Sequence, residues 1–493
     1  METLRKEIFM EERTLSRYPA GKRELIFGLL VLLFGTFTWN SILYGGFCLG
    51  FALGAMALTG CSFWYLLRCG FRPGKYEAAL LILAAAIFAG FARSSDGDMK
   101  AGMLLMALFA VNLSFCRMAG QSRRKLPICS GMVTAPRALF TLGVGSMSAA
   151  VRGLNDARKN AGTAGKRSGA AILGVLIALP VAAVLIVLLM RADAAFEGLM
   201  DMLPDTDWSE PLLSLFFGVF AGWILYSRGV GLKYAEKNGK EAKSFHGFSA
   251  ITVNILLGTV CLIYAVYLLS QLAYLGGGFA GILPDGYTLA EYARRGFFEM
   301  AWLSFINLGL MCLAMGLVEK KAGAPALTRG LCLFLGLAAL FLIAAASAKM
   351  LLYISGYGLT RKRVLTEIFM LWLGVTTILV SVWLFKPRFP YMKGAVICAL
   401  ILGCVTFWAD VDTQVARYNV RAYQSGQLET IDMGHMGCLG DGALPYIKEL
   451  THDRAPEIAS TAMDILENSY CSISDFRSWT YTESAARKAV DAD

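Results

Sequence analysis

Long apolar stretches that follow one another along most of the chain constrain its fold more than any other feature. A helix needs about 20 apolar residues to cross the hydrocarbon layer of a membrane. Eleven stretches approach that length, and four of them are short, so the count is eleven to within one or two. The predicted spans are 25–44, 47–67, 77–92, 101–116, 170–190, 211–226, 248–275, 297–318, 331–354, 365–385 and 395–408.

Composition supports a membrane protein. The 493 residues are 56% hydrophobic and only 17% charged, whereas soluble domains carry about 25% charged residues. This excludes a soluble enzyme, a disordered chain and a typical nucleic-acid-binding protein. The first 24 residues mix arginines with glutamates, unlike a cleaved signal peptide. The predicted fold class is therefore all-α, a polytopic transmembrane helical bundle of about eleven spans with a small soluble helical module at the C-terminus.

Charge distribution predicts the orientation. With the N-terminus in the cytoplasm, the cytoplasmic segments between the predicted spans hold 30 Lys and Arg residues, and the outer loops hold 8. Cytoplasmic loops are enriched in these cations. One cluster, Arg361-Lys362-Arg363, fits this pattern badly because it falls on the outer face. An odd number of spans places the C-terminus outside the cytoplasm.

Four regions are expected along the chain. Residues 1–116 contain the first four spans, and 170–408 form a membrane core of spans five to eleven. Between them, residues 117–169 are a basic cytoplasmic loop with an amphipathic helix on the inner leaflet. Residues 409–493 have 14 Asp and Glu against 7 Lys and Arg, so this tail has a net charge of −7 while the rest of the chain has +17.

The tail is predicted to be a soluble helical module. Capping and turn residues indicate helices over 413–423, 443–450, 456–468 and 482–490, with Ser474 or Asp475 as a cap. The only tail cysteines are Cys438 and Cys471. Outside the cytoplasm they have two alternatives, a disulfide or two reduced thiols.

Several ordered motifs resemble those of a known family. They are Leu176–Pro180, Ala192–Phe196, Gln271–Leu275, Tyr287–Glu299 with Asn307, Tyr357–Arg363, Asp410–Asp412, Ala416–Val420, Leu439–Asp441 with Pro445, and Phe476–Trp479. From about residue 170 onward, the chain resembles the bacterial membrane proteins of domain-of-unknown-function family 4173, with its relative 4153, whereas residues 1–169 match only loosely. The resemblance implies a bacterial plasma membrane and no particular activity.

Polar residues of these motifs fall at the outer ends of the predicted spans. We expect them to form one polar layer beneath the docked tail, supported by helical pairs such as Arg295 with Glu299 and Arg363 with Glu367. The candidate layer consists of Asp193, Gln271, Glu291, Arg294, Arg295, Glu299, Asn307, Arg361, Arg363, Asp410, Asp412 and Asn419. The favoured interpretation is that the layer neutralises itself and fastens the tail. The alternative is a pocket for a substrate or ion.

Motifs for catalysis, cofactors and metals are missing from the sequence. The chain has 3 His and 12 Cys residues. It lacks C-x-x-C pairs, metalloprotease and phosphate-binding-loop signatures, the nucleophile elbow and the dinucleotide-binding fingerprint. We therefore expect no cofactor and no metal ion. In the second span, Gly46, Gly50 and Gly54 form a small-residue stripe that predicts close helix packing.

Three classes of function stay open. The favoured class is a non-enzymatic envelope sensor, scaffold or assembly protein, whose partners are the lipid bilayer and another envelope protein bound through the tail. A transporter or permease for a small solute is the first alternative, because Pro180, Asn254, Asn307 and Glu299 fall within predicted spans. The second alternative is a membrane enzyme acting on lipid or cell-wall precursors, with its arginines holding a phosphate.

Overall fold

The computed structural model describes residues 22–94, 96–120, 209–234, 249–279, 297–318, 326–469 and 476–491. The elements within these ranges are helical, as predicted. The chain gathers into two compact units. Among the described residues, the first unit contains those up to 234 together with 476–484, and the second contains 249–469 and 485–491.

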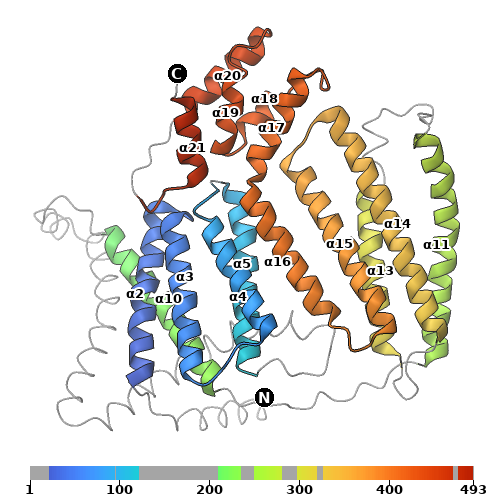
Figure 1. The fold of residues 1–493 in the computed structure, drawn as a ribbon, viewed down its shortest axis with the longest axis horizontal. Helices are drawn as coiled ribbons and strands as arrows, with labels where there is room; N and C mark the ends of the chain where they lie inside the picture. The colour runs from blue at the N-terminus through green and yellow to red at the C-terminus, as the bar shows by residue number, and fades with distance from the viewer. Residues whose placement is uncertain are drawn as a thin grey trace, which may run out of the picture. The chain divides into compact units, whose positions relative to one another are not determined.

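In the described residues, the first unit contains five apolar helices. They are α2 (Lys22–Gly45), α3 (Leu49–Arg68), α4 (Lys75–Gly90), α5 (Gly97–Met118) and α10 (Ser209–Tyr234). In Figure 1, α2 lies beside α3 and α10, and α4 lies beside α5, which agrees with the helix contacts. Phe27, Tyr65 and Tyr226 form a buried cluster where α2, α3 and α10 meet.

Small residues let these helices approach closely. A Cβ added at Gly54 would lie 2.9 Å from the Cβ of Thr38 on α2, and one at Gly50 would lie 2.8 Å from the hydroxyl of Ser41. At Gly218 of α10, an added Cβ would lie 2.6 Å from the Cα of Thr36. Two glycines of the predicted stripe, Gly50 and Gly54, therefore pack inside the unit. Gly46 instead forms the turn before α3, with a φ of +64°.

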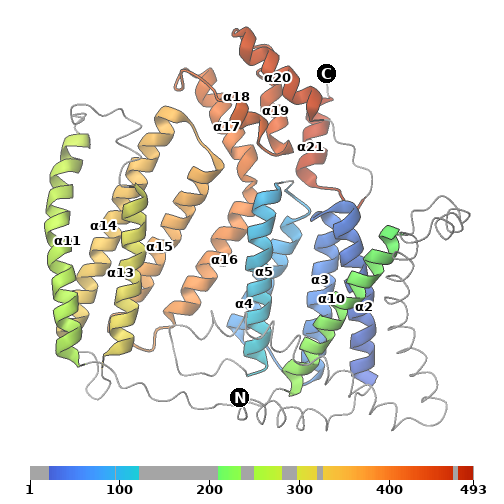
Figure 2. The ribbon, with the colours of Figure 1, turned by 180° about the vertical axis from the view of Figure 1, so that it is seen from behind.

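The described residues of the second unit include five long apolar helices before the tail. They are α11 (Ala250–Phe279), α13 (Phe297–Leu317), α14 (Ala326–Tyr357), α15 (Arg361–Phe385) and α16 (Tyr391–Ala409). Figure 2 shows α13, α14 and α15 side by side, and their buried faces share one apolar core around Leu335, Leu342 and Leu373. Asn254 of α11 is bonded to a neighbouring helix, because the Thr328 hydroxyl of α14 donates to the Asn254 side-chain oxygen at 2.6 Å.

The tail forms a small helical module in this second unit. Its elements are α17 (Val411–Gln424), α18 (Met433–Gly437), the 3₁₀ turn η2 (Asp441–Ala443), α19 (Leu444–Lys448) and α20 (Pro456–Asn468), while α21 (Tyr481–Val490) begins in the first unit. The four predicted tail helices are confirmed, and α18 is an addition. Ala416, Val420, Met436, Ile447 and Ala462 share a core of their own. Cys438 is exposed, whereas Cys471, Ser474 and Asp475 lie outside the described residues.

The helices of the membrane part carry apolar residues on their outer surfaces. Leu105 is 70% exposed and Ile251 is 73% exposed, as expected for side chains that face lipid. Seven described helices are long and apolar enough to cross a membrane. Within α13, Met300–Gly316 is a shorter apolar stretch. The chain is therefore a multi-span helical membrane protein. The predicted spans 77–92 and 211–226 coincide largely with α4 and α10. The predicted span at 170–190, Pro180 and the 117–169 loop beyond residue 120 lie outside the described residues. Eleven spans and the four domain boundaries stay predictions.

Replacing Gly54 by valine tests the close packing of α2 and α3. The added side chain meets Thr38 at less than contact distance, and such overpacking costs about 1–3 kcal/mol. We expect the detergent-solubilised protein to unfold at a lower temperature. Gly60→Val on the same helix is the matched control, because a Cβ added there meets nothing within 4 Å. Equal losses in the two variants would contradict the packing argument.

Candidate functional site

The junction of α16 and α17 is a sharp break in the helical backbone. Asp410 occupies the left-handed region with a φ of +53°, the one non-glycine residue with a positive φ among the described residues. Its Oδ2 accepts a hydrogen bond from the Thr413 hydroxyl at 2.6 Å. A Cβ added at Gly442 would lie 2.6 Å from the same carboxylate oxygen. The backbone of η2 therefore packs directly against this junction.

An ion pair joins three segments next to the junction. The Nε of Arg361, the first residue of α15, donates to Asp412 Oδ1 at 2.8 Å, and its Nη2 donates to Oδ2. The backbone N–H of Gly440 also donates to Asp412 Oδ2 at 2.8 Å. The Asp412 side chain is 1% exposed and that of Arg361 is 19% exposed. The fork-shaped guanidinium suits a carboxylate bonded at both oxygens. One buried carboxylate thus holds α15, α17 and the segment after α18.

Asn419 on α17 holds the loop between α14 and α15. Its side-chain oxygen accepts from the Leu359 N–H at 2.7 Å, and its side-chain nitrogen donates to the Leu359 carbonyl at 2.8 Å. Gly358 allows this approach, since its φ is +73° and an added Cβ would lie 2.7 Å from the Asn419 oxygen. The amide thus satisfies both backbone groups of one loop residue.

Arg363 turns back toward the end of α14. Its Nη1 donates to the Tyr357 carbonyl at 3.0 Å and to the Gly358 carbonyl, and its guanidinium lies 4.2 Å from the centre of the Tyr353 ring. The predicted pair of Arg363 with Glu367 is wrong, because no ion pair joins these two described residues. The last carbonyls of a helix lack partners within the helix and attract a cation. The Arg363 guanidinium therefore bonds to these carbonyls and not to Glu367, the partner that the helical spacing predicted.

Of the predicted polar layer, Arg361, Arg363, Asp410, Asp412 and Asn419 come together at one end of the second unit. Asn307 lies apart from them, fully buried in the middle of α13. Its neighbour Ser304 donates to the Ala339 carbonyl, and Ala339 precedes Tyr357 by 18 residues, or roughly 27 Å of helix. Gln271 and Glu299 lie in α11 and α13. The remaining four, Asp193, Glu291, Arg294 and Arg295, lie outside the described residues.

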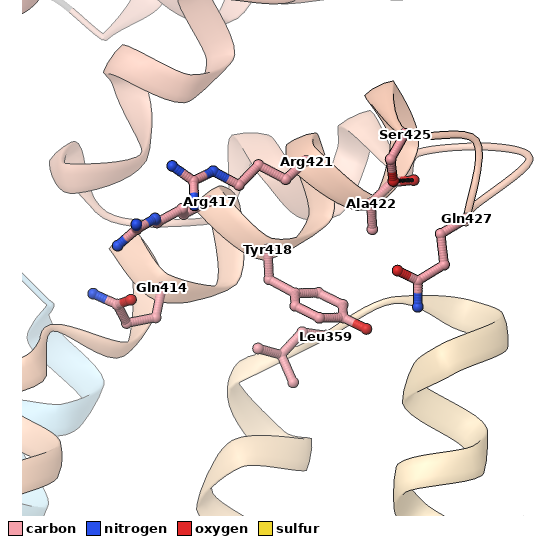
Figure 3. A pocket seen from close by; sticks show the side chains of 8 residues that line it. All are labelled: Leu359, Gln414, Arg417, Tyr418, Arg421, Ala422, Ser425 and Gln427. Atoms are coloured by element: carbon pink, nitrogen blue, oxygen red, sulfur yellow. Dashed lines mark hydrogen bonds between the residues drawn. The ribbon is translucent and has the colours of Figure 1, made fainter.

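A pocket of about 510 Å³ adjoins this cluster on α17. Figure 3 shows Arg417 and Arg421 next to each other on one flank and Tyr418 turned toward Leu359. Gln414, Ala422, Ser425 and Gln427 complete the lining. Sequence reasoning missed the pocket, although its signal is present. The buried residues Asp412, Ala416, Asn419, Val420 and their neighbours follow one face of α17, and helical periodicity puts the two arginines on the opposite face.

In the first unit, the motif Phe476–Trp479 and the residues after it bond to the ends of α2, α3 and α4. The N–H groups of Leu49 and Gly50, at the start of α3, donate at 3.2 Å to the carbonyls of Trp479 and Arg477. The Arg477 guanidinium donates to the Asn40 side chain and lies over the Tyr44 ring at 4.8 Å. Residues 476–482 also contact the end of α4, where the Tyr481 N–H donates to the Ala92 carbonyl at 2.9 Å.

The polar groups of this site make structural contacts. Its carboxylate, guanidinium and amide groups bond to one another and to the backbone. In the ranges that the structure describes, no group of three His, Cys, Asp or Glu residues has the arrangement of a metal site.

Near the tail core, burial and the neighbouring Asp453 carboxylate raise the pKa of Tyr423, whose hydroxyl donates to Asp453 at 3.2 Å.

Replacing Asp412 by alanine tests the ion pair. Loss of the carboxylate removes one buried acceptor from the Arg361 guanidinium and from the Gly440 N–H, which costs on the order of 3 kcal/mol. We expect a lower unfolding temperature and faster proteolysis of α17–α19. The double variant Arg361→Ala/Asp412→Ala should lose less than the sum of the single losses. Additive losses would mean that the two side chains act independently. Arg388→Ala, at an exposed position of the α15–α16 loop, is the control.

Comparison with protein-family models assigns the chain to a family more exactly than the motif resemblance did. The model of the family described as domain of unknown function DUF4153 matches residues 26–450. The match corrects the sequence-based assignment, in which 4173 was the main family and 4153 its relative. It also includes most of the N-terminal region that matched only loosely by motif. Comparisons with curated proteins and with solved structures gave no match. This multi-span helical membrane protein therefore belongs to the family described as domain of unknown function DUF4153.

Proposed function

We propose that this protein is a non-enzymatic sensor, scaffold or assembly protein that presents its helical tail at the membrane surface. The observation that carries the proposal is the bonding of Asp412 to Arg361 and Gly440. A catalytic carboxylate or arginine must be available to a substrate, whereas these groups are used to hold the tail on α15. The tail is then the part of the chain positioned for a partner.

The fixed position of the tail supports this role. Two independent contacts, Asp412 with Arg361 and Asn419 with Leu359, bind α17 to the start of α15 and to the loop before it. Between them α17 also contributes Tyr418 to the apolar core of the second unit. A module held in this way has a defined orientation relative to α14–α16, which is what a docking platform requires.

The contacts of the C-terminal residues also support a tail outside the cytoplasm. In the first unit, residues 476–482 contact the turn before α3 and the end of α4. In the second unit, α17 contacts the loop between α14 and α15. Each of these is a loop that the charge distribution assigns to the outer face. The same reasoning makes the partner another envelope protein.

Photo-crosslinking tests the tail as the partner-binding part. A benzophenone amino acid is placed at Met463 on α20, which is 48% exposed, and at Leu371 on α15, which is 55% exposed on the membrane part. We expect a discrete protein adduct from position 463 and none from 371. The adduct should disappear in the Arg361→Ala/Asp412→Ala background, because the tail loses its orientation. No adduct, or one indifferent to that double variant, would contradict the proposal.

Transport of a small solute is the second candidate, and Asn307 favours it. The side chain is fully buried in α13, and its contact with the Tyr264 hydroxyl of α11 falls short of a well-formed hydrogen bond. Buried polar groups are normally paired, so a water-filled path past Asn307 would account for it.

Thiol labelling separates the two candidates. A chain with its native cysteines replaced receives one cysteine, by Asn307→Cys or at the exposed position of Cys438. The proposed scaffold role predicts that a water-soluble maleimide labels position 438 and leaves position 307 unlabelled. Labelling at 307 at a comparable rate would favour transport.

A further inference from the structure

The pocket on α17 carries two arginines whose charges are not neutralised by the described residues. Arg417 and Arg421 are exposed and line the pocket. In the part of the chain that the structure describes, no carboxylate forms an ion pair with either of them. Their spacing of four residues places them one turn apart on the helix, where like charges repel by a few tenths of a kcal/mol. A bound anion would remove this repulsion.

The rest of the lining is suited to a ligand that is both polar and apolar. Gln414, Ser425 and Gln427 bring amide and hydroxyl groups to the rim, and Leu359 and Tyr418 provide an apolar floor (Figure 3). Leu359 belongs to the loop between α14 and α15, both of which are long and apolar enough to cross a membrane. The pocket therefore lies at the ends of two candidate membrane-spanning helices, which is where the headgroup region begins when such helices cross a bilayer.

We propose that this pocket binds the phosphate group of an anionic phospholipid headgroup. Guanidinium groups match phosphate oxygens in geometry as well as charge, because they present parallel N–H donors. Two of them one turn apart can hold one phosphate, with the glutamines and Ser425 near its ester substituent. The inference goes beyond the proposed function and does not depend on it. A lipid on α17 and a protein partner on α20 are separate contacts.

Thermal unfolding of the full-length protein in detergent tests the proposal. Three additives are compared at equal ionic strength: phosphatidylglycerol, phosphatidylcholine and inorganic phosphate. We expect phosphatidylglycerol to raise the unfolding temperature more than the other two. In Arg417→Gln/Arg421→Gln, the lipid concentration that gives half of the shift should rise about thirty-fold, because each arginine near a lipid surface contributes about a fivefold gain in affinity. The shift should also weaken with salt.

A matched pair of variants separates this pocket from general attraction to anionic lipid. Lys386→Gln/Arg388→Gln removes two exposed cations from the loop between α15 and α16, and we expect the phosphatidylglycerol response to stay at the wild-type level. Arg417→Lys/Arg421→Lys keeps the charge but loses the parallel donors, so its response should be intermediate. Equal losses in the two glutamine variants would overturn the proposal. A full shift with inorganic phosphate alone would overturn the assignment to a lipid.

Discussion

The bond between Arg361 and Asp412 is the interaction on which the arrangement of the second unit depends. A carboxylate that is 1% exposed is costly to remove from water unless it is fully paired. Two guanidinium N–H groups and the Gly440 N–H meet that requirement. The donors come from two segments, the start of α15 and the segment after α18, and the carboxylate lies in the first turn of α17, so satisfying one carboxylate fixes all three together.

The membrane part follows a different rule. Its backbone groups are satisfied within helices, as a lipid environment requires, and its outer surfaces are apolar. Close contact between helices then depends on small residues, as at Gly54 and Gly218. Specific polar contacts occur mainly where helices end. This division explains why the most informative polar residues of the chain gather at the α14–α15 loop and the α16–α17 junction.

Sequence reasoning reached the helical class, most of the apolar helices and the helices of the tail, because each depends on local composition and periodicity. It also selected Arg361, Asp412 and Asn419, since polar residues at the ends of spans need partners. It failed for Arg363, where spacing favoured Glu367 but the open carbonyls at the end of α14 accept the guanidinium. It also missed the Leu359 backbone as the partner of Asn419, because a backbone group leaves no trace in the sequence. The periodicity of α17 indicates the face that carries Arg417 and Arg421, but it does not indicate that Leu359 of the preceding loop lies against that helix, and the pocket between them was therefore missed.

The start of α3 has a consequence for biosynthesis. The N–H groups of Leu49 and Gly50 are among the earliest parts of the membrane domain to emerge from a ribosome, yet they bond to the carbonyls of Trp479 and Arg477. More than four hundred residues of translation separate the two sides of this contact. The first unit is therefore completed only after translation has passed Trp479. A chain that stops earlier leaves the N–H groups at the start of α3 without these acceptors.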